Sequence, residues 1–195
     1  MSNMDYIAAL KVLNEVRTDE IVITTMGSAR EWPRISNHPL DFHYIPSAMG
    51  QAPSLGLGIA LAKPTRQVWV LNGDGAMLMN LGCLVTVIAS GATNVTVFVL
   101  ENQIYEVTGG QRTPAGTLGP KIDLAGFARA AGFPVVARFE CLDDWRGQAA
   151  QLLRQSGPRF VVLAVEPVGE DYLLESPGPL PQRLAKFKQA LIEIE

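Results

Sequence analysis

Apolar residues fall into two patterns along the chain, short continuous runs and longer stretches with helical spacing. The runs are rich in β-branched residues, and continuous apolar runs are typical of parallel strands that are covered on both faces. In the longer stretches apolar residues recur every three or four positions, as Ile7, Leu10 and Leu13 do, which predicts helices. The predicted strands are 20–25, 67–73, 94–102, 134–139 and 159–165, and the predicted helices are 3–17, 50–64, 76–91, 123–131, 142–155 and a last helix that aligns Leu184, Phe187 and Leu191.

The alternation of these strands and helices predicts an α/β fold, a doubly wound, mostly parallel sheet with helices on both faces. Asn3 is a candidate cap for the first helix. The stretch 30–47 contains three prolines and no sustained period, which predicts a long loop, and the Gly-rich stretch 108–119 predicts another. The small residues of 50–64 predict a helix whose glycines let another element approach closely.

Composition narrows the function classes. The formal net charge of −3, without a cluster of Lys and Arg, argues against a nucleic-acid partner. The N-terminus has no signal-peptide pattern, and the apolar runs are too short to span a bilayer. We therefore expect a cytoplasmic protein with no membrane partner.

Length and cysteine content bound the architecture. At 195 residues the chain fits a single domain, 1–195, whose core needs neither a disulfide nor a metal to hold it. Cys83 and Cys141 have no metal-ligand spacing, so both are expected to be buried thiols. The hydrophobic content of 48% favours additional buried surface, such as a subunit interface.

A single carboxylate between two glycines, in the sequence LNGDGAMLMN, is the first candidate for chemistry. Asp74 follows the predicted strand 67–73, and Asn102 closes the strand 94–102. Because the carboxyl ends of neighbouring parallel strands meet at one edge of the sheet, we expect these two side chains to lie close together. Ligands collect at that edge in α/β proteins.

The residues at this edge suit a magnesium-bridged diphosphate. Carboxylate and amide oxygens are hard ligands for Mg²⁺, which shares its coordination sphere with water and phosphate oxygens. Gly73 and Gly75 let the backbone come close to a bulky anion, and a helix starting near Ala76 would direct its free N–H groups towards it. The alternative is a turn in which Asp74 caps a helix and Asn102 merely ends a strand. The spacing and strand context of the two halves together favour the ligand site.

The same residues carry a resemblance to a known family. The sequence from GDGAMLMN to VLEN resembles the cofactor-binding signature of thiamine-diphosphate enzymes. SAMGQAPSLGLGIALAKPTRQVWVLNGDGA and VTGGQRT resemble in particular the phosphonopyruvate and sulfopyruvate decarboxylase branch of the 2-oxoacid decarboxylases. The resemblance covers most of residues 20–115 and implies a lyase that removes CO₂ from a small anionic 2-oxoacid to give an aldehyde, with thiamine diphosphate and Mg²⁺ as cofactors.

The resemblance also implies a role for individual residues. Met49 matches the bulky apolar residue on which the cofactor bends, a catalytic role, and it would hold the pyrimidine edge through its N–H. Three positions depart from the family pattern, namely Glu101 for a first Asn, Ser47 for a common Gly, and Ala76 for a frequent Ser. The implied metal ligands are the side chains of Asp74 and Asn102 and the carbonyl of Ile104, and the implied cofactor-binding residues are Gly73, Gly75, Ala76 and Ser28 at the diphosphate and Ser47 and Met49 at the pyrimidine.

Some further residues stay open between a site and a structural role. His38 and His43 precede Met49, and His43 is the candidate for a second catalytic group that lines the substrate pocket or relays a proton. A loop histidine packed among aromatic residues is the alternative for both. Arg30 and Arg112 could meet an anionic substrate tail or lie at the surface, and Tyr105 and Glu106 could face the cofactor or a partner chain.

The resemblance finally implies a missing part. Family members carry a pyrimidine-binding domain, with a glutamate for the pyrimidine N1′, before the cofactor-binding domain, and here the first predicted strand already begins at residue 20. We expect a separate α subunit to supply that glutamate, so this β chain alone would be catalytically silent. We expect a hetero-oligomer, or a homodimer when the chain is in isolation. The alternatives are a non-catalytic cofactor-binding protein and a subunit of a carboligase of the acetolactate synthase type.

Overall fold

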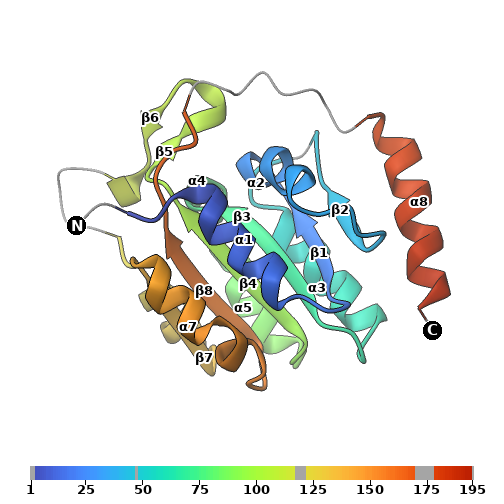
Figure 1. Cartoon of the computed structure of the whole chain (residues 1–195). Helices are drawn as coiled ribbons and strands as arrows, with labels where there is room; N and C mark the ends of the chain where they lie inside the picture. The colour runs from blue at the N-terminus through green and yellow to red at the C-terminus, as the bar shows by residue number, and fades with distance from the viewer. Residues whose placement is uncertain (1–2, 47, 117–121, 170–177, 195) are drawn as a thin grey trace.

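Six parallel strands form one sheet in the computed structural model of the chain, which describes residues 3–46, 48–116, 122–169 and 178–194 (Figure 1). The strands are β1 (Ile21–Thr24), β2 (Asp41–His43), β3 (Val68–Gly73), β4 (Val95–Glu101), β7 (Val135–Phe139) and β8 (Arg159–Ala164). Their order is β2-β1-β3-β4-β8-β7. The central strands β3, β4 and β8 are buried almost throughout, which is why their sequences are continuous apolar runs.

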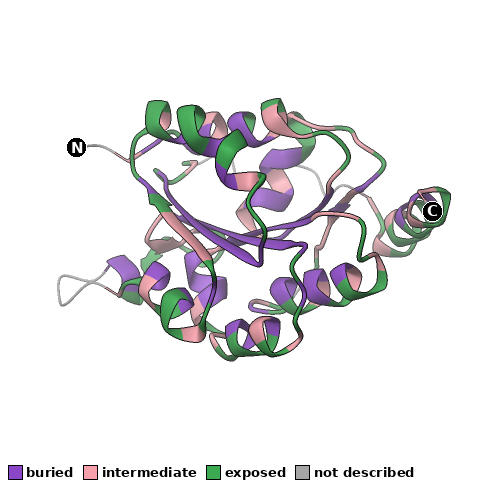
Figure 2. Cartoon of the chain, turned by 90° about the horizontal axis from the view of Figure 1, so that it is seen from below, coloured by how far each residue is buried: buried purple, intermediate pink, exposed green. Residues whose placement is uncertain are grey.

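Helices cover both faces of this sheet, and the buried strands lie between two helical layers (Figure 2). One buried apolar cluster joins one face to α1 and α7, and a second cluster joins the other face to α3, α5, α6 and α8. The predicted doubly wound α/β fold is confirmed. None of the helices in the described part of the chain is long and apolar enough to cross a membrane. The helices are α1 (Tyr6–Val16), α2 (Gly27–Glu31), α3 (Ala52–Ala62), α4 (Asp74–Leu78), α5 (Gly82–Ala89), α6 (Leu124–Ala131), α7 (Leu142–Leu153) and α8 (Leu180–Glu193).

The loop predicted over 30–47 is wrong, because this stretch contains the edge strand β2 and, before it, a 3-10 helix (Trp32–Arg34). Phe42 of β2 is buried and stacks on Phe187 of α8, with the ring centroids 4.9 Å apart. Only the middle residue of the three-residue strand is buried, so β2 produces no apolar run in the sequence. Its strand character comes from pairing with β1.

The single helix predicted over 76–91 is wrong as well, because two helices occupy this stretch. The first of them, α4, starts at Asp74, and α5 follows after a turn. Asn80 lies in that turn, where its side-chain Nδ2 donates to the carbonyl oxygen of Gly50 at 3.0 Å. The apolar pattern continues through the turn, so periodicity gave no sign of the break.

Smaller differences concern caps, turns and thiols. Asp5, and not Asn3, caps α1, since its Oδ1 accepts from the N–H of Ala8 at 2.7 Å. The predicted loop 108–119 contains the second strand of a short hairpin, β5 (Ile104–Tyr105) with β6 (Gln111–Arg112), and its last three residues lie outside the described ones. Cys83 is buried as expected, whereas the expectation for Cys141 is wrong because that thiol is exposed.

The close approach predicted for the small-residue helix is confirmed at Gly56. A Cβ placed on Gly56 would lie 2.2 Å from Cγ2 of Val70, so only glycine lets α3 pack this tightly on β3. This contact fixes α3 against the strand that leads directly to Asp74.

Candidate functional site

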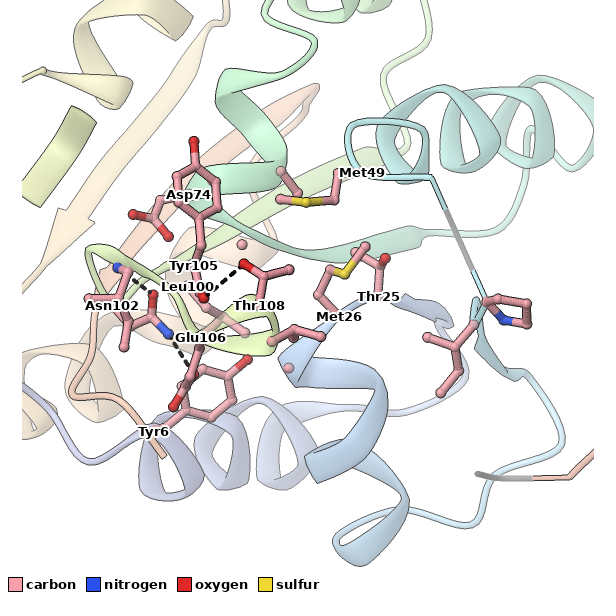
Figure 3. A pocket seen from close by; sticks show the side chains of 18 residues that line it. Tyr6, Thr25, Met26, Met49, Asp74, Leu100, Asn102, Tyr105, Glu106 and Thr108 are labelled. Atoms are coloured by element: carbon pink, nitrogen blue, oxygen red, sulfur yellow. Dashed lines mark hydrogen bonds between the residues drawn. The ribbon is translucent and has the colours of Figure 1, made fainter. Parts of the chain in front are cut away.

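A cavity of about 320 Å³ opens at the carboxyl ends of β1, β3 and β4. This is the edge at which ligands bind in open α/β sheets. Figure 3 shows Asp74 and Asn102 at one end of the cavity and Met26 and Met49 towards the other. The predicted site residues that line it are Met49, Gly73, Asp74, Gly75, Ala76, Asn102 and Ile104.

Asp74 supplies a buried carboxylate with one oxygen left over. Its side chain is in the first turn of α4 and the residue is 1% exposed. Oδ2 accepts from Oγ1 of Thr113 at 2.7 Å, whereas Oδ1 is buried without a hydrogen-bond partner among the described residues. Burial raises the pKa of Asp74 to about 6, although the hydrogen bond from Thr113 opposes the rise. A cation beside Oδ1 would compensate this buried charge.

Asn102 supplies a side-chain amide whose nitrogen and oxygen each have a hydrogen-bond partner. It follows β4 and lines the cavity together with Asp74. Its Nδ2 donates to Oε2 of Glu106 at 2.7 Å, and its Oδ1 accepts from the N–H of Ile104 at 3.2 Å. Gln103 adopts a left-handed conformation with φ of 65°, which makes the tight turn between these residues. The second lone pair of the Asn102 oxygen remains for a ligand.

The donor set fits Mg²⁺ better than a transition metal. The described residues contain no group of three His, Cys, Asp or Glu side chains that could hold a metal ion. Zinc and related ions prefer the nitrogen of His and the sulfur of Cys as ligands. One carboxylate, one amide oxygen and a backbone carbonyl instead match an ion that keeps waters and binds ligand phosphates.

The glycines around Asp74 leave room for the ligand. A Cβ placed on Gly73 would meet nothing within 4 Å, so a side chain there would enter the open space of the cavity. A Cβ on Gly75 would lie 2.5 Å from Cε1 of Tyr105, so the Tyr105 ring packs directly on the Gly75 backbone. The open cradle beside Gly73 has room for a bulky anion next to Asp74.

The wall around Met49 is apolar and partly strained. Met26 also lines the cavity, and its backbone has φ of 52° and ψ of −126°, a conformation that non-glycine residues rarely adopt. Such strain is often found at ligand sites. The sequence gave no sign of this residue, because backbone conformation at a methionine leaves no compositional mark.

Ser28 and His43 are not among the residues that line the cavity. The hydroxyl of Ser28 is buried and lies 2.7 Å from the carbonyl oxygen of Leu71, so it ties α2 to β3. His43 lines a separate hollow beside α8, and its Nδ1 is 2.9 Å from Oγ1 of Thr24. Burial lowers the pKa of His43.

Among the remaining candidates, His38 contacts Arg17, with Nδ1 3.3 Å from a guanidinium nitrogen, and does not line the cavity. Arg112 is exposed on β6 and donates to the carbonyl oxygen of Gly116 at 3.2 Å. Arg30 lies in α2 and does not line the cavity. Ser47 lies outside the described residues. The site that the structure brings together is therefore centred on Asp74.

Four further residues lie around Asp74 and Asn102. Tyr105 and Glu106 both line the cavity. Thr113, for which no pattern in the sequence predicted a role, is the last residue of VTGGQRT and is fully buried. Glu101 is buried and pairs with Arg138 of β7 at 2.6 Å.

The chain matches a known protein family over most of its length. Residues 24–163 match the family described as thiamine pyrophosphate enzyme, C-terminal TPP binding domain. The matched segment starts in β1 and ends in β8, so it contains the whole cavity edge of the sheet.

Curated relatives resemble the chain over most of its length. It is 39% identical over 188 residues to phosphonopyruvate decarboxylase of Streptomyces viridochromogenes, covering 95% of this chain and 46% of that protein. It is 40% identical over 169 residues to sulfopyruvate decarboxylase subunit beta of Methanothermobacter thermautotrophicus, covering 86% of this chain and 85% of that one. The chain thus spans about half the length of the first relative and most of the second.

Solved structures show the same fold. Benzoylformate decarboxylase from Polynucleobacter necessarius superposes with a TM-score of 0.68 at 20% identity, covering 83% of this chain and 33% of that one. A putative thiamin diphosphate-dependent enzyme from Mycobacterium smegmatis gives a TM-score of 0.67, also at 20% identity, covering 85% of this chain and 32% of that one. At this identity the likeness concerns the fold alone.

Proposed function

Because the chain belongs to the thiamine pyrophosphate enzymes, in the family of their C-terminal TPP binding domain, we propose that it is the cofactor-binding subunit of a 2-oxoacid decarboxylase that acts on sulfopyruvate or phosphonopyruvate. The single observation that carries the proposal is the buried Oδ1 of Asp74, which has no hydrogen-bond partner among the described residues and lies at the same end of the cavity as Asn102. A cation would compensate a buried carboxylate oxygen that has no donor, and the family match identifies which cofactor that cation would hold.

Different residues of the cavity would bind different parts of this cofactor. Asp74, Asn102 and the carbonyl of Ile104 would hold Mg²⁺, and the open space beside Gly73 would take the diphosphate. Met49 would support the ring end at the apolar wall. When bound, thiamine diphosphate supplies a carbon nucleophile and an electron sink, which is the chemistry that removal of CO₂ from a 2-oxoacid needs.

The charges around the cavity support the need for a second chain. Asp74 and Glu106 are the two carboxylates that line it among the described residues, and both are engaged at the metal end. The glutamate for the pyrimidine N1′ would therefore come from a partner. The described residues that line the cavity include no Lys, Arg or His, so a positive charge for the anionic tail of the substrate would also come from outside this set of residues.

Names of relatives and exposed surface agree with such a partner. The Methanothermobacter relative, of which this chain covers 85%, is named as a beta subunit. Val107 at the cavity rim is 43% exposed, and Met79 and Val85, at the end of α4 and on α5, are 56% and 61% exposed. We propose that a pyrimidine-binding subunit covers these side chains, and that residues 1–195 form one cofactor-binding domain.

The decisive experiment measures decarboxylation by the full chain with and without a candidate partner chain that carries a pyrimidine-binding domain. We expect aldehyde formation from sulfopyruvate or phosphonopyruvate only when both chains, thiamine diphosphate and Mg²⁺ are present, and we expect Asp74→Ala to abolish it. Asp144→Ala is the matched control, because Asp144 also lies in the first turn of a helix but is exposed. Activity that survives Asp74→Ala, or tight cofactor binding without activity in any pairing, would contradict the proposal.

A further inference from the structure

Glu106 makes a pair of contacts that the proposed function does not require of it. It lines the cavity on the loop after Asn102, and each of its carboxylate oxygens accepts hydrogen bonds from a different part of the chain. We propose that Glu106 is a positioning residue, which fixes the side-chain amide of Asn102 with its oxygen available to the metal. This inference rests on the proposed function, because it assumes that Asn102 is a metal ligand.

The first step of the argument is the orientation of the Asn102 amide. An amide can rotate by half a turn, which exchanges an oxygen that binds Mg²⁺ for an NH₂ group that repels it. Here Nδ2 of Asn102 faces Oε2 of Glu106, and an ionised carboxylate accepts hydrogen bonds but donates none. Oδ1 of Asn102 faces the N–H of Ile104, which donates but does not accept. A rotated amide would oppose acceptor to acceptor and donor to donor at both ends, so the pair of contacts permits one orientation (Figure 3).

The second step is that Glu106 is itself held in place. Its other oxygen, Oε1, accepts from the backbone N–H of Val168 at 2.6 Å and lies 3.3 Å from that of Gly169. These residues follow β8, the strand that pairs with β4 just before Asn102. Hydrogen bonds to an ionised carboxylate are stronger than neutral ones. Glu106 therefore connects Asn102 to the segment that follows β8.

The third step is that a carboxylate suits this place better than its amide. Glutamine has the same shape but one acceptor oxygen, so it can serve either Asn102 or the backbone of Val168, but not both. Alanine serves neither. Residues that orient a metal ligand from behind typically change metal affinity by about 10- to 100-fold when they are replaced.

The test measures magnesium-dependent binding of thiamine diphosphate to the full chain by calorimetry, in wild type, Glu106→Ala and Glu106→Gln. We expect Glu106→Ala to raise the Mg²⁺ concentration needed for half-maximal binding by about 10- to 100-fold. We expect Glu106→Gln to give a smaller increase, because its one acceptor oxygen can still accept from Asn102 at the expense of Val168. Glu193→Gln is the control for loss of one negative charge, since Glu193 is exposed at the end of α8.

Two further readouts separate positioning from general damage. At saturating Mg²⁺ the affinity of Glu106→Ala for thiamine diphosphate should return to that of wild type, whereas a merely unstable site would bind poorly at every Mg²⁺ concentration. Amide hydrogen exchange at Val168 should be faster in Glu106→Ala than in wild type, because its acceptor is gone. Melting temperatures of both variants confirm that they are folded.

The possible results separate a failure of the positioning role of Glu106 from a failure of the proposed function. If wild type binds in a magnesium-dependent way and Asp74→Ala does not, but both Glu106 variants keep the Mg²⁺ dependence of wild type, then the positioning role is wrong and the proposed function stands. If Glu106→Gln weakens binding as much as Glu106→Ala while Glu193→Gln has no effect, loss of local charge explains the result and the orientation argument is overturned. If wild type shows no magnesium-dependent binding, the proposed function and this inference both fail.

Discussion

Replacing Asp74 by Asn should stabilise the metal-free chain at neutral pH. The carboxyl group of Asp74 is 1% exposed, and burial raises its pKa from 3.8 to about 6. An acid whose folded pKa is raised binds more protons in the folded state, so the free energy of unfolding falls as pH rises from about 4 to about 6. Asparagine has nearly the same shape and no charge, so the variant avoids this loss.

The magnitude follows from the pKa. At about 1.4 kcal/mol for each pKa unit, the change from 3.8 to about 6 corresponds to roughly 3 kcal/mol above pH 6. The Asp74→Asn variant keeps one side-chain oxygen as an acceptor for Thr113, which retains that hydrogen bond. We therefore expect Asp74→Asn to be more stable than wild type by up to about 3 kcal/mol at pH 7.5, and nearly equal to it at pH 4.

Urea unfolding in the presence of EDTA, at several pH values between 4 and 8, measures this difference directly. Addition of Mg²⁺ with thiamine diphosphate at pH 7.5 should then stabilise wild type and leave Asp74→Asn unchanged, because ligand binding stabilises only a state that binds it. The reasoning is refuted if Asp74→Asn is less stable than wild type at pH 7.5, or if the difference between the two does not vary with pH.

Three further substitutions test other parts of the site. Thr113→Val removes the donor to Oδ2 of Asp74, so it should weaken magnesium-dependent cofactor binding by about 10- to 100-fold in calorimetry, and an unchanged affinity would exclude a role for that contact. Gly73→Val should leave the melting temperature nearly unchanged, since φ of −93° and ψ of 159° suit any residue. It should abolish thiamine diphosphate binding, because the side chain would fill the open space beside Asp74, and retained binding would show that the diphosphate does not bind there. Gly56→Ala should cost about 1–3 kcal/mol in urea unfolding because its Cβ would overlap Val70, and Val70→Ala in the same chain should recover part of that loss, which a backbone effect alone would not allow.

The centre of the site could be predicted because it depends on sequence order alone. Continuous apolar runs identified the strands before Asp74 and Asn102, and parallel pairing of β3 with β4 then brings their carboxyl ends together. The close packing at Gly56 was visible for a similar reason, since small residues in a helix indicate a close neighbour. These predictions needed no knowledge of side-chain contacts.

The supporting contacts could not be predicted, because they join residues that are distant in sequence. Thr113 reaches Asp74 across 39 positions, and Glu106 reaches Val168 across 62. No periodicity or spacing records such pairs. For the same reason the sequence could not tell that His43 lies in a hollow next to α8, since β2 itself was hidden in a proline-containing stretch.

The most direct measurement of the central claim is a crystal structure of the full chain grown with thiamine diphosphate and Mg²⁺. We predict an octahedral ion at about 2.0–2.1 Å from Oδ1 of Asp74, the side-chain oxygen of Asn102 and the carbonyl oxygen of Ile104, with diphosphate oxygens and water completing its sphere. A diphosphate bound elsewhere, or a water molecule in place of the ion beside Asp74, would contradict it.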